Sequence, residues 1–544
     1  MSTNPSQLPS RVEQTLAECP QFRILITGNT GIGKSSLVSK IFNVDLNELD
    51  IAHDRAGRAN IEHGFTSSTN PRFILHDSQG YEPGNLNQWG VAEAFIKARA
   101  KHEHPQERVH AIWLCIETPR TGGRLLQVGD ENLIKLALKL ELPLLVIFTK
   151  YDLLITEKFK EFDKDNTTKS HTQSYSEHLQ IDVQPYPERL QIATKRADDD
   201  FQQRVKGLPK HPTIEYITVS TNEKIFKDCL GSFQNLTKVT RRMLHHVEGE
   251  LWVPWATAQQ VNASQKIETS ISEGFKKYWL DLGTNVVFEG FLMWDCVSRI
   301  HRDILEIWNF NDPDGLLTGN EFCTQMVQLT QPILIKSDKK EKDEGQSGYF
   351  SDLSDAVTVA GHIATGFAQA LGVAGIAVAT IKFLYKRYQR IPITSLYLAS
   401  YITSLIIILR SLFIQTLTQD PPRPLTKDLV TFTWQTYVDN DANRILNSVK
   451  EATRGGEIEN PELKVAGIIR EFFHIEPDSH SLNREANRPD IGPAKNTKRI
   501  ILKPEKSVSQ TSSTLTSSPE EMSFTQGGSK KKKKFSFASI FNKK

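Results

Sequence analysis

The ten-residue stretch Gly28–Leu37 (GNTGIGKSSL) limits the possible folds of this chain more than any other feature. It follows the apolar run Phe22–Thr27 and leads into the apolar-periodic segment SSLVSKIF. Its Gly-xxxx-Gly-Lys-Ser spacing, between a strand and a helix, matches the phosphate-binding P-loop pattern. Backbone N–H groups of such a loop and the N-terminus of its helix surround phosphates. The sequence therefore predicts a nucleotide site, against the alternative of a glycine-rich turn that only begins a helix.

The residues of this loop have separate expected roles. The glycines are needed because a Cβ would collide with a phosphate or forbid the backbone angles of the loop. Lys34 would bring its charge to the terminal phosphates, and Ser35 would offer its hydroxyl to Mg²⁺. The nucleotide contacts expected from this stretch are Gly28, Asn29, Thr30, Gly31, Ile32, Gly33, Lys34, Ser35 and Ser36.

Short apolar runs alternate with helical patterns from residue 21 to about residue 248, which predicts an α/β fold with a parallel, doubly wound sheet. A mostly α-helical C-terminal half is expected to follow. The segment from Thr156 to His211 is long, charged and poor in strand signals, so we expect a helical insertion before the last strand. The strands are expected at Phe22–Thr27, Phe73–His76, Ala111–Ile116, Leu144–Phe148 and Tyr216–Val219.

Three further motifs follow expected strands. Asp77-Ser-Gln-Gly80 has the DxxG form, in which the acid can hold Mg²⁺ through water and the glycine N–H can contact a terminal phosphate. In Thr149-Lys150-Tyr151-Asp152, the carboxylate can accept hydrogen bonds from the ring N–H and the exocyclic amine of guanine, which adenine does not offer. Ser220, Thr221 and Asn222 follow the last expected strand, and these small polar residues could support the edge of the base.

These motifs occur in order, each at the carboxyl end of a strand, where open α/β sheets bind ligands. The region from 21 to about 248 resembles the P-loop GTPases, in particular the translation-factor-like class with its HSR1/MMR1-like G domains. The phrases HDSQG, HAIWLCIETP and KYDLL also resemble those of large fungal G-domain-containing proteins. The resemblance implies GTP or GDP with Mg²⁺ as ligands, Ser35 and Asp77 as metal ligands, and Lys34 and Gly80 as the residues at the reacting phosphate.

The sequence departs from this family in two places. Tyr81 stands where Ras-type members carry the glutamine that orients the attacking water. No threonine lies between Lys40 and Ile61 to close over Mg²⁺. Thr66 and Thr69 are the nearest candidates, but Ile61–Ser67 could instead be a strand that pairs with Arg72–His76 through the turn at Ser68–Pro71, and then neither threonine would be free to act. We therefore expect slow GTP hydrolysis, raised, if at all, by self-association or a partner. The alternatives are a non-hydrolysing scaffold that acts through its C-terminal helices, or an ATPase.

Charge and cysteine content narrow the class of protein. Basic and acidic residues nearly balance, at 66 against 64, so no nucleic-acid partner is expected. Five scattered cysteines form no CxxC or Cys/His cluster, which disfavours a disulfide framework and a zinc site. No secretory signal is recognised at the start of the sequence. These features favour the cytoplasm, with membrane association left open.

Shifts in composition divide the chain into expected segments. Two uncharged apolar blocks, Val357–Ile381 and Ile391–Leu409, fit either a membrane hairpin or a buried helical core. Five lysines at 530–534 precede aromatic residues, which suggests an anionic membrane surface as a partner of residues 530–544, against a nuclear-import signal or a solvated tail. The expected segments are a mobile arm 1–20, a G domain 21–248, a helical module 249–335, a charged linker 336–350, two apolar helices 351–418, a helical segment 419–476 and a disordered tail 477–544.

Overall fold

The computed structural model describes twelve stretches of the chain, and all of them belong to one compact unit spanning Met1–Leu482. The rest of the molecule, including the expected linker 336–350, the first apolar block and the tail from 477, lies outside the described residues. The described stretches are 10–53, 61–78, 86–120, 122–172, 186–222, 224–226, 228–245, 251–284, 293–330, 391–419, 422–452 and 461–473.

A five-stranded parallel sheet forms the centre of the N-terminal half, in the order β2-β1-β3-β4-β5. The strands of such a sheet are covered on both faces, which explains why they are runs of apolar residues without alternation. The expected fold class is confirmed, and the fifth strand begins two residues earlier than the pattern indicated. The strands are β1 (Phe22–Thr27), β2 (Phe73–Asp77), β3 (Ala111–Glu117), β4 (Leu144–Thr149) and β5 (Ile214–Thr218).

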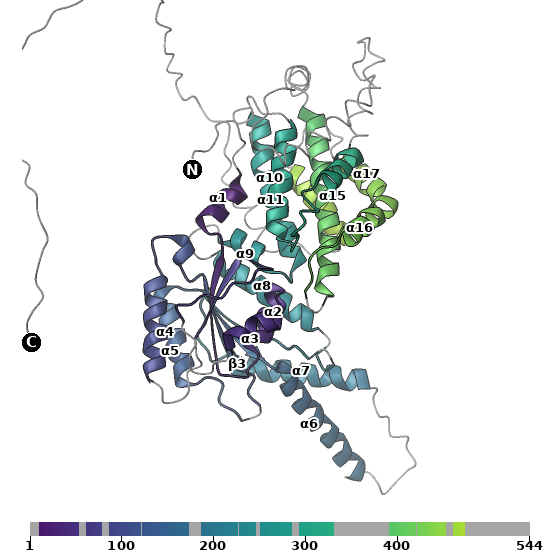
Figure 1. Cartoon of the computed structure of the whole chain (residues 1–544). Helices are drawn as coiled ribbons and strands as arrows, with labels where there is room; N and C mark the ends of the chain where they lie inside the picture. Colours follow the sequence, from purple (N-terminus) through teal and green to yellow (C-terminus); the bar gives the residue numbers. More distant parts are fainter. Residues whose placement is uncertain are drawn as a thin grey trace, which may run out of the picture. The chain divides into compact units, whose positions relative to one another are not determined.

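Helices cover both faces of the sheet and build a separate apolar core on each face. One core contains residues of α2 and α8, and the other contains residues of α4, α5, α6 and α7. The paired helices α6 and α7 form the expected insertion before the last strand (Figure 1). The helices of this half are α2 (Lys34–Phe42), α3 (Leu46–His53), α4 (Leu86–Arg99), η1 (Pro105–Glu107), α5 (Val128–Leu140), α6 (Tyr151–Thr172), α7 (Tyr186–Val205) and α8 (Cys229–Leu244).

The N-terminal segment expected as a mobile arm contains a packed helix, α1 (Arg11–Glu18). Ser10 is the N-cap of this helix, and its hydroxyl accepts a hydrogen bond from the backbone N–H of Glu13. The helix is amphipathic, and its apolar side chains Val12 and Leu16 are buried against Trp252, Val253 and Ile307. The prediction was wrong because the partners of this short apolar stripe lie more than two hundred residues away in the sequence.

The second half is all helical in its described residues, and its helices from residue 263 onward share one core. Described residues of the three segments expected at 249–335, 351–418 and 419–476 therefore pack together, and residues 331–390 lie outside the described residues. Helix α15 contacts α10, α11, α16, α17 and α18. The helices are α9 (Trp252–Ala258), α10 (Ala263–Thr284), α11 (Met293–Trp308), an unlabelled helix at 320–330, α15 (Ile391–Leu417), α16 (Lys427–Asn440), α17 (Ala442–Ala452) and α18 (Pro461–Phe473).

Helix α15 contains the second apolar block. Its segment Leu396–Leu417 is long and apolar enough to cross a membrane, yet 83% of the most apolar window is buried inside the structure. Tyr401 and Ser404 of this helix hydrogen-bond to His301 and Tyr437 of neighbouring helices. The arrangement is that of a core helix, and the block at 357–381 lies outside the described residues.

The boundary expected at residue 248 falls inside a packed region. Trp255 of α9 is fully buried, and its ring contacts those of Phe22, Phe42 and Trp113. The same core reaches Val261. We therefore define the sheet half as the described residues up to 261 and the helical half as those from 263 to 473.

Candidate functional site

The carboxyl ends of all five strands meet at one edge of the sheet, and the predicted motifs lie there. The register pairs Ile26 with Asp77, so the DxxG acid lies beside the start of the P-loop. Ser78 N–H donates a 3.0 Å hydrogen bond to the Ile26 carbonyl and holds this arrangement. At the other side, Phe148 pairs with Thr218, which brings the ends of β4 and β5 together.

The glycines of the P-loop are required for two different reasons. Gly28 has a φ of +138°, and a Cβ there would lie 2.2 Å from the backbone oxygen of Cys115. Gly31 and Gly33 also have positive φ values, but no described atom lies within 4 Å of their ideal Cβ positions. The first glycine thus lets the loop approach β3, whereas the other two give the backbone its shape and leave space beside it.

Helix α2 begins at Lys34, directly after this loop. The lysine Nζ donates hydrogen bonds to the carbonyls of Gly28, at 2.9 Å, and Asn29, at 3.4 Å. Ser35 and Ser36 are half-buried in the first turn, and this fully described turn contains no acidic side chain. The partial positive charge of the helix N-terminus and the lysine therefore act on the same space, which suits an anion. Asn29, Thr30 and Gly31 are exposed at the rim, and buried Ile32 anchors the loop.

Asp77 ends β2 and is half-buried. Burial raises the pKa of the nearby Cys115 thiol to about 12, with Lys34 lowering it and Asp77 raising it further. Lys34 and Asp77 therefore both act electrostatically on the Cys115 thiol, which lies near the end of β3. Gly80 and Tyr81 lie outside the described residues, so the proposed phosphate contact and the departure at Tyr81 stay predictions.

A metal ion bound at the P-loop end of the site would have few protein ligands. Within the described ranges, no group of three or more His, Cys, Asp or Glu side chains is placed to hold a metal ion. Ser35 and Asp77 offer one hydroxyl and one carboxylate. That donor set fits Mg²⁺, which keeps several waters and binds through one or two carboxylates together with phosphate oxygens.

Asp152 lies at the opposite end of the site, in the first turn of α6, with only 7% of its surface exposed. Ser220 Oγ donates to its Oδ1 at 2.7 Å, and Asn222 Nδ2 donates to its Oδ2 at 3.1 Å. The structure thus brings together the predicted Asp152 and Ser220, whereas Thr221 is exposed. Asn222 was expected only to support the edge of the base together with Ser220 and Thr221, and the structure shows its amide bound to the Asp152 carboxylate.

Thr149 and Lys150 have different roles beside this carboxylate. Thr149 is buried, and its hydroxyl donates to the Ile116 carbonyl, so it joins β4 to β3. Lys150 has a left-handed φ of +53°, an uncommon value for a residue with a side chain. Its Nζ forms a 2.9 Å ion pair with Glu117 at the end of β3. The sequence analysis missed Glu117, because an acid at a strand end has no motif of its own.

Thr66 and Thr69, the threonines considered for closing over Mg²⁺, lie in the described stretch 61–78, whereas residues 54–60 lie outside the described residues. The expected strand at Ile61–Ser67 reduces to one antiparallel bridge, Phe65 to Leu75, so the strand prediction holds at a single position. Thr66 accepts a hydrogen bond from Gln21, and the Thr69 hydroxyl is 2.8 Å from that of Ser67. Both threonines are thus engaged away from the P-loop.

Comparisons with known proteins find similarity to a family model and to a GTPase. Residues 316–472 match a family described as "Domain of unknown function (DUF8505)", which spans most of the helical half. The chain is also 26% identical over 168 residues to the GTPase Der of Deinococcus deserti, which covers 30% of this chain and 34% of that protein. Part of this chain is therefore GTPase-like. The chain spans about a third of the length of this relative, and the comparison supports the broader resemblance to P-loop GTPases expected from the motifs.

Proposed function

We propose that this chain binds guanine nucleotides, with Mg²⁺, at the carboxyl edge of its sheet and acts as a nucleotide switch that hydrolyses GTP slowly. The observation that carries the proposal is the Asp152 carboxylate, held by Ser220 and Asn222 on the same edge as the P-loop. An ionised carboxylate has about four acceptor positions, so two remain for a ligand after these two bonds. Guanine offers two adjacent donors that match them.

The phosphate end of the site supports the same ligand. Lys34 and the N-terminus of α2 supply positive charge, and the open space beside Gly31 and Gly33 admits phosphate groups close to the backbone. Bound Mg²⁺ would neutralise charge that develops on the phosphates, with Ser35 and Asp77 as its protein ligands. Lys34 and Gly80 are the proposed contacts to the terminal phosphate, and Tyr81 in place of glutamine is our reason to expect slow hydrolysis.

The base specificity can be tested on the full chain. We expect GTP and GDP to bind, and ATP to bind at least 10-fold more weakly, because adenine lacks the two donors. The Asp152→Asn variant should bind GTP about 10- to 150-fold more weakly. This range corresponds to the loss of a hydrogen bond to a charged group, which contributes about 1.5–3 kcal/mol. The variant should gain affinity for xanthosine triphosphate, whose 2-oxo group matches the new amide donor.

The matched control is Asp163→Asn on the same helix, which removes an ion pair with Arg189 and should leave nucleotide affinities unchanged. Equal binding of ATP and GTP by the unaltered chain, or an Asp152→Asn variant that keeps both its GTP affinity and its preference for guanine, would refute guanine recognition by Asp152.

A second candidate function is a non-hydrolysing scaffold in which bound nucleotide only stabilises the fold. It is favoured by the far end of α2, whose last carbonyls accept hydrogen bonds from Asn70 and Gln260 at the junction with the helical half. Single-turnover conversion of GTP to GDP by the full chain distinguishes the two candidates. Measurable cleavage that rises with protein concentration supports a switch activated by self-association, and binding without cleavage supports the scaffold.

A further inference from the structure

The helix that begins at the P-loop ends in the junction between the two halves. Helix α2 spans nine residues, or roughly 13 Å at 1.5 Å per residue. Gln260 N–H donates to the Ile41 carbonyl at 2.7 Å, and Asn70 Nδ2 donates to the Phe42 carbonyl at 2.9 Å. The end of α2 opposite the phosphate site is thus held by groups outside the helix.

Asn70 is the central residue of this junction, and only 2% of its surface is exposed. Its Nδ2 donates both to Phe42 O and to the Ala258 carbonyl at the end of α9. Its Oδ1 accepts from Asn309 Nδ2 at 2.9 Å and from the Arg72 N–H at 3.3 Å. Two donors and two acceptor positions are all that an amide side chain has, so Asn70 is fully engaged.

The C-terminal end of α9, in the sheet half, and that of α11, in the helical half, meet at the same place. Lys266 is buried and donates from Nζ to the carbonyls of Ala256, Thr257 and Ile307, at 3.0 to 3.2 Å. Gln260 Nε2 donates to the Asn309 carbonyl at 3.0 Å. The last carbonyls of both helices are thus satisfied by side chains of the junction, which fixes these helix ends relative to each other.

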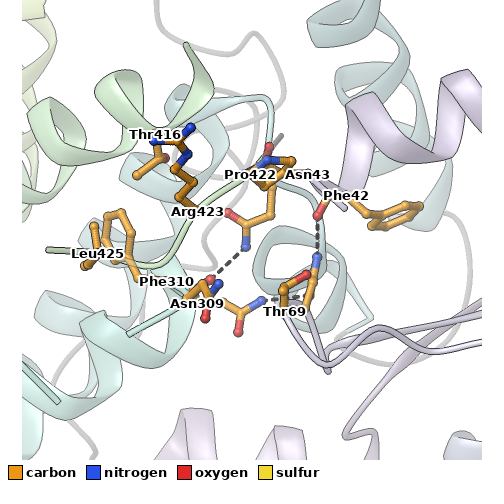
Figure 2. Close-up of a pocket in the computed structure, with 12 residues that line it drawn as sticks. Phe42, Asn43, Thr69, Asn309, Phe310, Thr416, Pro422, Arg423 and Leu425 are labelled. Carbon is orange, nitrogen blue, oxygen red and sulfur yellow. Dashed lines mark hydrogen bonds between the residues drawn. The ribbon is translucent and has the colours of Figure 1, made fainter. Parts of the chain in front are cut away.

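The junction is closely packed. A cavity of about 20 Å³, room for about one water, lies between Phe42 and Thr69 of the sheet half and Asn309 and Leu425 of the helical half (Figure 2). The ion pair between Arg72, the residue before β2, and Glu306 of α11 adds a further contact. Because close-packed interiors transmit displacement and have little space to absorb it, movement of α2 here must displace α9 and α11.

We propose that α2 couples nucleotide occupancy at its N-terminus to the stability of the helical half at its C-terminus, through the Asn70–Asn309 hydrogen bond. The inference rests on the proposed nucleotide binding and adds the route by which the site is regulated. Coupling of this kind is reciprocal, so whatever binds the helical half changes nucleotide affinity by the same factor. Asn70 and Asn309 are positioning residues in this scheme and do not touch the nucleotide.

Amide hydrogen exchange on the full chain, with and without GDP and Mg²⁺, tests the coupling. We expect GDP to slow exchange in α2 and also in α9, α11 and α15. The expected slowing is about 5-fold or more, because about 5-fold corresponds to the lower end of typical coupling free energies. The Asn309→Gly variant should still bind GDP and protect α2, with protection of α11 and α15 reduced to less than about 2-fold. Glycine suits the left-handed φ of +49° at this position, so the substitution removes the side chain without backbone strain.

The matched control is Asn43→Gly at the end of α2. It has a similar φ of +53°, and its side chain has no hydrogen bond among the described residues. This variant should keep the full GDP-dependent protection. Exchange without nucleotide, measured on each variant, separates a general loss of stability from a loss of the GDP response.

Three outcomes would overturn the inference, and they differ in what else fails. Absence of GDP binding by the unaltered chain removes the proposed function together with the coupling. Binding with protection confined to the P-loop and α2 leaves the function intact and removes the coupling. Protection of the helical half that Asn309→Gly leaves unchanged removes the Asn70–Asn309 route.

Discussion

The Ser220 hydroxyl donates a 2.7 Å hydrogen bond to the Asp152 carboxylate across 68 residues of sequence. The bond joins the loop after β5 to the first turn of α6, and both groups are buried. Because the acceptor is ionised, this bond is among the stronger ones available to a serine, and it fixes the direction in which the remaining lone pairs point. The geometry offered to a base therefore depends on a residue that need not touch the base.

Replacement of Ser220 by alanine should weaken guanine binding more than phosphate binding. We expect a loss of about 1.5–3 kcal/mol in GTP affinity, or roughly 10- to 150-fold, because one carboxylate oxygen loses its charged hydrogen bond. The affinity for ATP should change much less. Titration of both nucleotides measures the difference. The Ser448→Ala variant in α17 is the control, because Ser448 is exposed and its hydroxyl donates to the Arg444 carbonyl of its own helix. An equal effect of the two variants would contradict the role of Ser220.

Replacement of Gly28 by alanine should damage the site and the fold together. The added Cβ would meet the Cys115 backbone oxygen at 2.2 Å, and the φ of +138° is strained for alanine. We expect a lower thermal midpoint and loss of nucleotide binding, since neither backbone can move aside cheaply. Gly90→Ala in α4 is the control, because its Cβ meets no described atom within 4 Å and alanine in a helix gains about 0.5–1 kcal/mol. Thermal unfolding of both variants checks the contrast.

Buried histidines should make stability depend on pH below neutrality. Burial lowers the pKa of both His110 and His301 from 6.5 to about 4. The unfolded chain therefore binds more protons than the folded chain between these values. Stability is full above pH 6.5 and falls as the pH drops toward 4, by about 1.4 kcal/mol per pH unit for each histidine.

The His301→Gln variant isolates one of these contributions. His301 accepts a hydrogen bond from the Tyr401 hydroxyl at Nδ1 and donates to the Leu317 carbonyl at Nε2, and a glutamine amide can reproduce both. Urea unfolding between pH 4 and 6.5 should show a shallower dependence for the variant. An unchanged slope would mean that His301 is protonated at the same pH in the folded and unfolded chains.

Shortening a buried leucine of α15 creates a cavity in the core around this helix and should destabilise the whole helical half. Leu405 is fully buried in its core, so Leu405→Ala should cost about 2–5 kcal/mol. Phe432→Ala on α16 is the control, since that ring is 65% exposed and surface substitutions usually stay within about 0.5 kcal/mol. Thermal unfolding with a probe in the helical half compares them. Equal midpoints for Leu405→Ala and the unaltered chain would contradict the position of α15 as a core helix.

The sheet and the order of its motifs could be predicted because their signals are local. Each strand is a short, mostly apolar run, and each motif carries its spacing within a few residues. Lys34, Asp77, Asp152 and Ser220 accordingly lie along the predicted edge of the sheet. Glu117, the partner of Lys150, could not be assigned in the same way, because what defines it is the neighbouring strand end that it faces.

The division into segments could be predicted only where composition changes. Helix α1 has an apolar stripe of two buried side chains, too short to distinguish from a polar arm without knowing where Trp252 and Ile307 lie. Trp255 reads as the start of a new helical module, yet it completes the core beneath β1 and β3. Both errors have one cause, which is that packing across the junction joins residues far apart in the sequence.

The same long separations in sequence determine when these contacts can form during translation. Asn70 meets Asn309 only when 239 more residues have been made, which takes roughly 10 to 50 s at 5–20 residues per second. Until residue 255 has been made, the apolar surface of β1 and β3 that Trp255 later covers faces water or a chaperone. A ribosome that stalls before the codon for residue 255 would therefore hold a sheet with an uncovered core, and that intermediate is where aggregation of this protein should begin.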